Sequence, residues 1–275
     1  MQWITSRFNI NLDSPRIMGI VNFTPDSFSD GGRYDNPAAA LRHCERLIGE
    51  GAHILDIGGE STRPGSPVVP LDIELSRVLP VVKEAVTLGV PVSVDTYKPD
   101  VMRAVLDLGV DIINDVWALR HEGTAPVVAT HPRCGICLMH MHRDPRSMQV
   151  APMVGHVLPE VKRFLTERAQ ALEFMGVARG RIVLDPGVGF GKTVEQNFSL
   201  LGQQAELVAL GYPLLAGWSR KSSLGAVTGQ EMPSGRVAAS VAAALLSVER
   251  GARVVRVHDV RATADALKVL SALMA

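Results

Sequence analysis

The sequence predicts a single-domain (β/α)8 barrel, both from the order of its elements and from its length. Short apolar segments alternate with helical patterns along all 275 residues, and this alternation builds a parallel sheet covered by helices. About eight such units in a chain of this size match a closed barrel of eight strands. A doubly wound open sheet is the alternative, because the same units can also build it. No shift of composition or low-complexity linker indicates a second large domain.

Each predicted strand is a short run rich in branched apolar residues, as strands buried on both faces require. These runs are Ile17–Val21, Ile54–Ile57, Pro91–Asp95, Ile112–Val116, Ile136–Met139, Ile182–Leu184, Leu214–Trp218 and Val254–Val257. Helical patterns follow nearly all of them, over Pro37–Glu50, Leu71–Leu88, Lys98–Leu108, Gly123–Thr130, Pro152–Met175, Val194–Leu210, Pro233–Glu249 and Arg261–Met274. Several of these helices end before a glycine, which readily adopts the left-handed conformation of a helix C-terminus.

Residues 1–16 are predicted to form a short hairpin, with strands Ile4–Phe8 and Asn9–Leu12, that packs on the bottom of the barrel. Residues 17–275 then form the (β/α)8 domain. The longest apolar run, Val237 to Val248, is too short to span a bilayer and predicts a buried helix. The first residues lack the apolar stretch of a signal peptide, so we expect a cytoplasmic protein without a membrane partner.

Charge and cysteine content narrow the function classes further. The formal net charge is zero and the isoelectric point is near 7.1, so no basic field indicates a nucleic-acid partner. Cys134 and Cys137 form a C-x-x-C pair, which could be a redox pair or half of a zinc site. No second pair of this kind exists and Cys137 lies in an apolar strand, so buried thiols are favoured.

Polar residues stand where the predicted strands end, which in a parallel barrel is the face that carries active sites. The residues at these positions are Asn22, Asp95, Asn114, Asp185, Arg256 and His258. Any one of them could be a helix cap or a satisfied hydrogen bond. Their recurrence at successive strand ends, beside glycine-rich loops that permit close approach of a ligand, predicts an active site.

The residue types at this face indicate the ligand. Cations near helix N-termini predict a site for an anion, and they are Arg63, Arg220, Lys221 and Arg256. Asn22 offers an amide oxygen to Mg²⁺, which commonly takes one or two protein ligands together with phosphate oxygens. Asp95, Asn114 and Asp185 offer acceptors that suit a flat heterocycle rich in N–H groups.

Two motifs favour other functions only weakly. Gly191-Lys192-Thr193 resembles the end of a P-loop, but Pro186 stands where that motif needs its first glycine. His140 and His142 could suggest a metal site, yet no clear third ligand is near them in the sequence. Strand-end or loop histidines are the favoured interpretation.

Longer segments carry a family resemblance over nearly the whole chain. The segments Met18–Gly32 (MGIVNFTPDSFSDGG) and Asp56–Gly65 (DIGGESTRPG) are long signatures, and shorter motifs follow in order at Ser93–Thr96, Ile113–Asp115, Asp185–Lys192, Ser219–Ser222 and Arg256–Asp259. Together they resemble the dihydropteroate synthase family of pterin-binding barrels. The resemblance implies condensation of 6-hydroxymethyl-7,8-dihydropterin diphosphate with 4-aminobenzoate, assisted by Mg²⁺, in a homodimeric enzyme that sulfonamides inhibit.

The resemblance also implies roles for individual residues, taken at the matching positions of this sequence. The residues expected to act in catalysis are Asp185, Lys221, Arg256, Arg63 and Asp95. Those expected to bind the pterin diphosphate are Thr62, Asp95, Asn114, Asp185, Lys221, Arg256 and His258. Those expected to bind aminobenzoate are Thr62, Arg63, Pro64, Phe190, Lys221, Ser222 and Phe28, and the metal ligand is Asn22. The loops Asn22–Asp35 and Gly58–Pro70 are expected to close over the substrates and exclude water.

Two alternatives share the pterin site. A methyltetrahydrofolate-dependent methyltransferase would keep the Asp and Asn acceptors but would not need the loops around Phe28 and Arg63. A catalytically inactive pterin-binding paralogue would not need Asn22, Lys221 or His258, which are all present. Both alternatives are therefore less favoured than the synthase.

Overall fold

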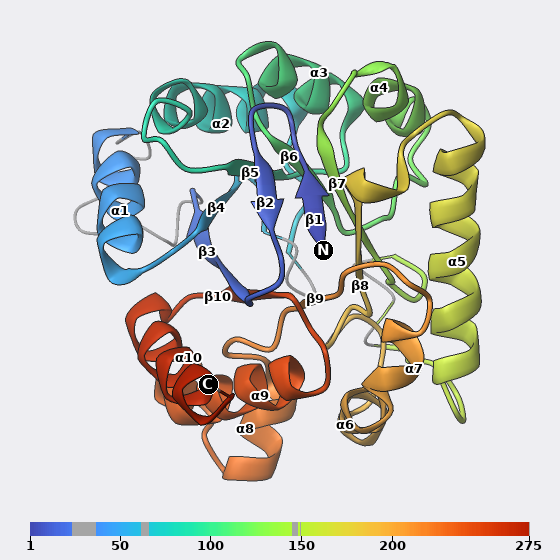
Figure 1. The fold of residues 1–275 in the computed structure, drawn as a ribbon. Helices are drawn as coiled ribbons and strands as arrows, with labels where there is room; N and C mark the ends of the chain where they lie inside the picture. Colours follow the sequence, from blue (N-terminus) through green and yellow to red (C-terminus); the bar gives the residue numbers. More distant parts are fainter. Residues whose placement is uncertain (24–36, 62–65, 145–147, 149, 275) are drawn as a thin grey trace.

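The computed structural model describes residues 1–23, 37–61, 66–144, 148 and 150–274. Its main sheet has eight strands in the order β8-β7-β6-β5-β4-β3-β10-β9, and every neighbouring pair is parallel. A bridge between Leu184 and Leu214 joins the two ends of this order. The sheet thus closes into the predicted barrel, which Figure 1 shows from one end.

The barrel strands lie close to their predicted positions. They are β3 (Arg16–Asn22), β4 (Ile54–Gly58), β5 (Val92–Asp95), β6 (Ile112–Asp115), β7 (Gly135–Met139), β8 (Ile182–Asp185), β9 (Leu215–Ala216) and β10 (Val254–Val257). The clearest difference is β9, which is only two residues long, whereas Leu214–Trp218 was predicted. The chain after Ala216 leaves the sheet at Gly217 and turns into the loop that carries Ser219 and Lys221.

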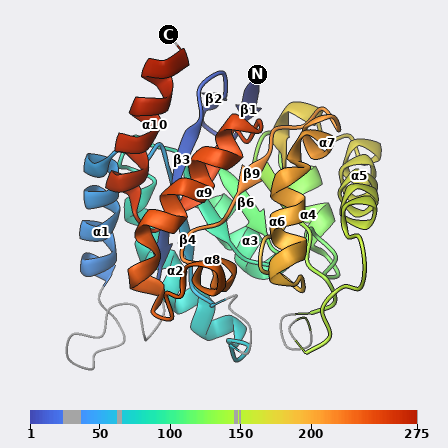
Figure 2. The same cartoon turned by 90° about the horizontal axis from the view of Figure 1, so that it is seen from below.

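Helices surround the barrel, and several neighbours in sequence pack side by side, as Figures 1 and 2 show. The helices are α1 (Pro37–Glu50), α2 (Leu71–Ala85), α3 (Pro99–Asp107), α4 (Thr124–Thr130), α5 (Leu158–Phe174), α6 (Val194–Gly202), α7 (Gln204–Val208), α8 (Ser222–Thr228), α9 (Val237–Glu249) and α10 (Val260–Met274). No helix in these described ranges is both long and apolar enough to cross a membrane.

Three helical predictions need correction. The segment predicted as one helix over Val194–Leu210 forms α6 and α7, which are separated at Gln203. The helix predicted from Pro152 begins only at Leu158. Helix α8 was not predicted, since most of its seven residues, SSLGAVT, are weak helix formers such as Ser, Gly, Val and Thr.

The N-terminal hairpin is present, with strands β1 (Gln2–Ile4) and β2 (Asn9–Asn11). Its first strand lies earlier than the predicted Ile4–Phe8, because the chain turns between Thr5 and Phe8 and the Thr5 amide donates to the Phe8 carbonyl at 2.9 Å. Trp3 is fully buried, and its Nε1 atom donates to the Arg181 carbonyl at 2.9 Å. The hairpin lies across the end of the barrel in Figure 1.

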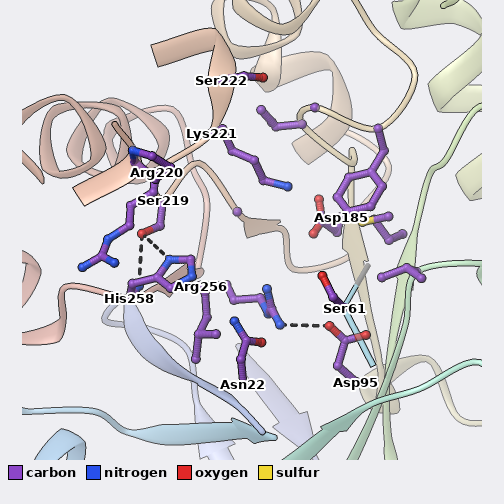
Figure 3. Close-up of a pocket in the computed structure, with 18 of the residues that line it drawn as sticks. Asn22, Ser61, Asp95, Asp185, Ser219, Arg220, Lys221, Ser222, Arg256 and His258 are labelled. Atoms are coloured by element: carbon purple, nitrogen blue, oxygen red, sulfur yellow. Dashed lines mark hydrogen bonds and ion pairs between the residues drawn. The ribbon is translucent and has the colours of Figure 1, made fainter. Parts of the chain in front are cut away.

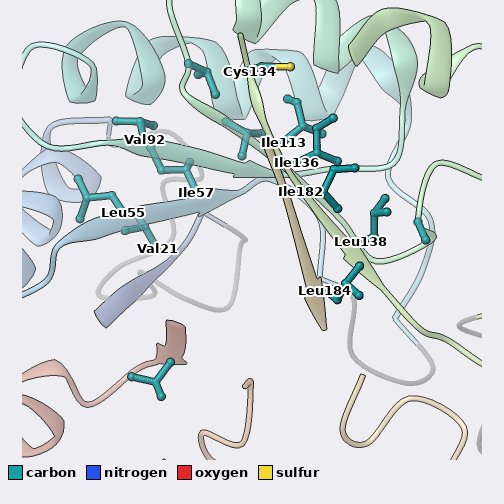
Figure 4. Close-up of a cluster of buried hydrophobic side chains, with 14 of the residues drawn as sticks. Val21, Leu55, Ile57, Val92, Ile113, Cys134, Ile136, Leu138, Ile182 and Leu184 are labelled. Carbon is teal, nitrogen blue, oxygen red and sulfur yellow. The ribbon is translucent and has the colours of Figure 1, made fainter. Parts of the chain in front are cut away.

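Side chains that point into the barrel are apolar in its lower part, near the N-terminal ends of the strands, and mostly polar in its upper part, near the C-terminal ends. Lower inward positions pack against the hairpin residues Trp3, Ile10 and Leu12. These inward residues are Met18, Ile54, Ile112, Cys137, Val183, Leu215 and Val254. Outward residues of the same strands pack against the helices, as Figure 4 shows for Leu55, Ile113 and Leu184 among others.

The next inward position lies two residues further along each strand, because successive side chains of a strand point to opposite faces. Four of the strands carry a polar residue there, namely Asp56, Asn114, Asp185 and Arg256. Apolar packing against the hairpin therefore closes one end of the barrel, and the strand ends above it are left to form a polar site.

Candidate active site

A cavity of about 390 Å³ opens at the C-terminal ends of the strands. Its walls come from the ends of β3, β5, β6, β7, β8 and β10 and from the loops after β8 and β9. The residues expected from sequence that line it are Asn22, Asp95, Asn114, Asp185, Phe190, Lys221, Ser222, Arg256 and His258. Figure 3 shows the side chains gathered around this space, with labels on Asn22, Asp95, Asp185, Lys221, Ser222, Arg256 and His258 among others. Strand ends far apart in the sequence therefore form one site.

Arg256 is held on the cavity floor by two carboxylates from neighbouring parts of the barrel. Its Nε atom donates to Asp56 Oδ2 at 2.6 Å, and its Nη2 atom donates to Asp95 Oδ2 at 2.9 Å. Asn114 Nδ2 donates to the same oxygen of Asp56 at 3.2 Å. Asp56 thus fixes the orientation of two cavity residues from below.

Sequence reasoning missed Asp56 as a site residue, although it falls within one of the motifs. It does not line the cavity, and its side chain is fully buried. The period-two pattern could have found it: Asp56 follows the inward Ile54 by two residues, as Arg256 follows Val254. The pairing itself joins residues 200 positions apart, so only barrel closure brings them together.

The charges on this floor perturb one another. Burial raises the pKa of Asp95 to about 7, and the positive charge of Arg256 opposes that rise. Burial works against the charge of Arg256, but Asp56 and Asp95 outweigh it and raise the Arg256 pKa further. The arginine is therefore permanently charged, whereas Asp95 titrates near neutral pH.

Asp185 presents a carboxylate to the cavity in a fixed orientation. Its Oδ1 atom accepts the Gly187 amide at 2.7 Å. Burial raises the pKa of Asp185, while the Gly187 hydrogen bond and the charge of Lys221 lower it. Gly187 has φ of +69°, and a Cβ atom there would lie 1.8 Å from the His140 carbonyl oxygen, so only glycine fits this turn.

Lys221 and Phe190 form the wall beside Asp185. The Lys221 Nζ atom lies 4.2 Å from the centroid of the Phe190 ring, which is within the range of a cation–π contact. In Figure 3 the Lys221 side chain extends into the cavity in the direction of Asp185. Ser222 follows at the first residue of α8 and also lines the cavity.

A second polar group lies where β10 meets the loop after β9. Ser219 Oγ accepts the His258 amide at 3.0 Å and lies 3.0 Å from His258 Nδ1. Arg220 lines the cavity, but Asp259 binds its guanidinium in a bidentate pair of 2.6 Å and 3.0 Å. Arg220 is thus a partly neutralised cation, in contrast to the anion-binding role that sequence alone suggested.

Arg236 lines the same wall and was not anticipated. Its Nη1 atom donates to the Arg220 carbonyl at 3.0 Å, and its Nε atom donates to the Gln230 carbonyl at 2.8 Å. It is the last residue of a short 3-10 helix, Pro233–Arg236, within a segment that was predicted to be one continuous helix. No sequence signal marked this arginine, because its place depends on the loop it crosses.

Four expected site residues lie outside the described residues, namely Phe28, Thr62, Arg63 and Pro64. The same holds for residues 24–35 of the first loop expected to close over the substrates and for residues 62–65 of the second. Asn22 and Ser61, which flank these stretches, both line the cavity.

His140, Cys134 and Cys137 belong to the motifs considered as metal or redox sites, and all three are buried. His140 is buried, its Nδ1 atom lies 2.9 Å from Lys192 Nζ, and its ring contacts Phe164 edge-on. Burial raises the thiol pKa of both Cys134 and Cys137. Within the described ranges, no group of three or more His, Cys, Asp and Glu side chains is arranged to hold a metal.

Comparison with known proteins agrees with this site. The model of the pterin binding enzyme family matches residues 18–258. The dihydropteroate synthase of Neisseria meningitidis serogroup C is 53% identical over 98% of this chain and 97% of its own. The structure of the Xanthomonas albilineans dihydropteroate synthase with 4-aminobenzoic acid has 49% identity and a TM-score of 0.94, covering 100% of this chain and 99% of that one.

A third relative is the Burkholderia cenocepacia dihydropteroate synthase complexed with 7,8-dihydropteroate. It is 50% identical, with a TM-score of 0.89, and the match covers 99% of this chain and 96% of that one. Full-length identity at this level, together with a common barrel and a polar site at its strand ends, leaves one conclusion. The chain belongs to the pterin-binding enzymes and, among them, to the dihydropteroate synthase family.

Proposed function

We propose that the protein condenses 6-hydroxymethyl-7,8-dihydropterin diphosphate with 4-aminobenzoate. The bond from the pterin methylene carbon to the diphosphate oxygen breaks, a bond from that carbon to the amine nitrogen forms, and the amine releases a proton. The products are 7,8-dihydropteroate and diphosphate. The ligands of the related Xanthomonas albilineans and Burkholderia cenocepacia structures support this assignment.

The observation that carries the proposal is the set of acceptors on the cavity floor. Asp95, Asn114 and Asp185 all line the cavity, and Asp95 Oδ1 is a buried oxygen that has no hydrogen-bond partner among the described residues. Buried acceptors of this kind are costly unless a donor satisfies them. The amino and ring N–H groups of a pterin supply such donors along one edge of a flat ring.

The cations above this floor suit a departing diphosphate. Arg256 reaches the cavity from β10, His258 from just after it and Lys221 from the loop after β9, and Arg63 joins them on the evidence of the sequence motif. The positive charge of the methylene carbon is delocalised into the pterin ring, so the diphosphate can leave before the amine attacks. Fixed positive charges stabilise the developing negative charge without reorganising at the moment of reaction.

Asn22 is the proposed protein ligand of Mg²⁺. It lines the cavity and carries a neutral amide oxygen, and a single hard oxygen ligand fits an ion that takes its other ligands from phosphate and water. When bound, Mg²⁺ would neutralise charge on the diphosphate. Asn22 itself would orient the phosphate end of the substrate toward β3 and away from the pterin acceptors.

The aminobenzoate site is proposed along the wall formed by Phe190, Lys221 and Ser222, completed by Phe28, Thr62, Arg63 and Pro64. An aromatic ring beside Phe190 and a carboxylate near Ser222 would place the amine toward the pterin methylene carbon. Sulfonamides, which carry an aromatic amine of similar shape, are proposed to bind there. We further propose a homodimer in the cytoplasm, as the family resemblance implies.

The decisive experiment incubates the purified protein with both substrates and Mg²⁺ and follows dihydropteroate and diphosphate together. Equal amounts of the two products are expected, with little turnover after chelation of the metal. The Asp265→Asn variant, at an exposed position that does not line the cavity, should behave as wild type. Binding of the pterin without turnover would indicate an inactive paralogue, and methyl transfer from methyltetrahydrofolate would indicate the methyltransferase.

A further inference from the structure

Lys192 is a buried cation that the proposed reaction does not use. It directly follows the glycine-rich loop Asp185–Gly191, which joins β8 to α6, and only 4% of its surface is exposed. It does not line the cavity. Its Nζ atom instead lies 2.9 Å from the Gly187 carbonyl oxygen and 3.2 Å from that of Phe190. The ammonium therefore points into the loop that precedes it.

A third group completes the surroundings of this ammonium. His140 Nδ1 lies 2.9 Å from Nζ, and the His140 carbonyl oxygen lies 3.4 Å away. Burial and the charge of Lys192 lower the His140 pKa to about 2, so the imidazole is neutral and accepts from the lysine. Lys192 thus ties the glycine-rich loop to the chain that leaves β7.

The loop needs such a tie because its backbone is unusual. Gly187, Gly189 and Gly191 have φ of +69°, +80° and +72°, and glycine loses more conformational freedom on ordering than any other residue. Carbonyl groups that converge in a buried space repel one another and lack water. The Lys192 ammonium among them reduces this repulsion and donates hydrogen bonds to the carbonyl oxygens in place of water. Burial lowers the Lys192 pKa to about 7, while the charge of Asp185 opposes this.

The same loop carries the groups that face the cavity. Asp185 begins it and Phe190 lies near its end, and both line the cavity. A Cβ atom at Gly189 would lie 3.3 Å from Lys221 Cδ, so the Lys221 side chain rests on the loop backbone. A shift of Gly189 or Phe190 therefore moves the wall of the proposed aminobenzoate site.

Asp185 is less dependent on Lys192 than the rest of the loop. It is the last residue of β8, and its carbonyl accepts the His140 amide at 2.9 Å within the β7–β8 pairing. Asn197 provides a separate hold on Gly189, whose amide donates to Asn197 Oδ1 at 2.9 Å. Loss of Lys192 should loosen Gly187–Phe190, and it reaches the Asp185 carboxylate only through the Gly187 amide and through the lost charge, so the pterin carboxylate should be disturbed less than the wall.

We propose that Lys192 is a positioning residue for the reaction, whose ammonium gathers the carbonyl groups of the glycine-rich loop and so fixes Phe190 and Lys221 relative to Asp185. The proposal rests on the proposed function for its kinetic consequence. It predicts a split between the two substrates, because the more disturbed wall faces aminobenzoate and the less disturbed floor faces the pterin.

The test compares Lys192→Met, which keeps length without charge, with wild type and with Lys83→Met at an exposed position of α2. For Lys192→Met, kcat/KM for aminobenzoate should fall on the order of tenfold or more, while the pterin dissociation constant changes by a clearly smaller factor. Lys83→Met should match wild type in both. Lys192→Gln keeps N–H donors without the charge, so its kcat/KM for aminobenzoate should lie between those of Lys192→Met and wild type.

Hydrogen exchange of the segment 185–192 gives a readout that needs no turnover. Lys192→Met should exchange faster there than wild type, with β4 unchanged. Unaltered exchange and kinetics would overturn the proposal, as would a fall in kcat that only tracks lost folded protein while both KM values stay constant. If Lys192→Met does not fold, Lys192→Gln with a wild-type KM for aminobenzoate overturns it instead. An inactive wild type with faster exchange in the variant would refute the proposed function alone.

Discussion

Replacing Asp185 by Asn tests the pterin site with little disturbance of the fold. Asp185 Oδ1 accepts the Gly187 amide at 2.7 Å, and an Asn amide oxygen can accept the same bond. The amide NH₂ group then occupies the place of Oδ2 and faces the cavity, where a pterin would present another donor. The fixed orientation of this side chain makes the exchange of acceptor for donor unavoidable.

The size of the effect follows from the bonds lost. A hydrogen bond to a charged group contributes about 1.5–3 kcal/mol, and tenfold in affinity corresponds to about 1.4 kcal/mol. Asp185→Asn should therefore weaken binding of the pterin diphosphate by roughly 10- to 150-fold. Titration calorimetry measures this directly. The apparent melting temperature should change little, because the Gly187 bond persists.

Asp115→Asn is the matched control. Asp115 is also buried at the end of a strand, but its two oxygens accept the amides of Trp117 and Leu119 at 2.7 Å and 2.8 Å, and it does not line the cavity. Its replacement should lower stability and leave pterin affinity near that of wild type. Equal affinity of Asp185→Asn and wild type would remove Asp185 from the pterin site and refute the reasoning.

Three further outcomes are expected. Asp56→Ala should lower the free energy of unfolding by roughly 3 kcal/mol in denaturant titrations and weaken pterin binding, because Arg256 loses a buried partner; unchanged stability would contradict this. Burial raises the Asp95 pKa from 3.8 to about 7, so pterin affinity should rise as pH increases through about 7, and the pH profile of Asp95→Asn should be flatter. As pH increases from about 4 to 7, only the folded state still holds this proton, so the contribution of Asp95 to stability should fall. Dihydropterin, diphosphate and Mg²⁺ together should raise aminobenzoate affinity on the order of tenfold, and Arg256→Ala should abolish the increase; equal affinity for empty and loaded protein would favour direct displacement.

Much of the fold was predictable because it depends on local periodicity. Alternating apolar runs and helical patterns gave the barrel and its hairpin, and all of the predicted barrel strands are present. Elements without a pattern of their own were missed or misplaced. Helix α8 consists mostly of weak helix formers and strand β9 has only two residues, and the break between α6 and α7 falls in a segment whose helical pattern continues.

The sequence by itself also identified which strand ends carry polar chemistry. Asp95, Asn114, Asp185 and Arg256 were expected at one face, since the ends of parallel strands meet at one edge of a sheet. The structure decided which of them touch. Arg256 pairs with Asp56 and Asp95, 200 and 161 positions away, because barrel closure sets the strands beside one another. Lys192 turns away from the cavity into its own loop, since backbone carbonyls there provide the contacts that a strand-end motif does not reveal.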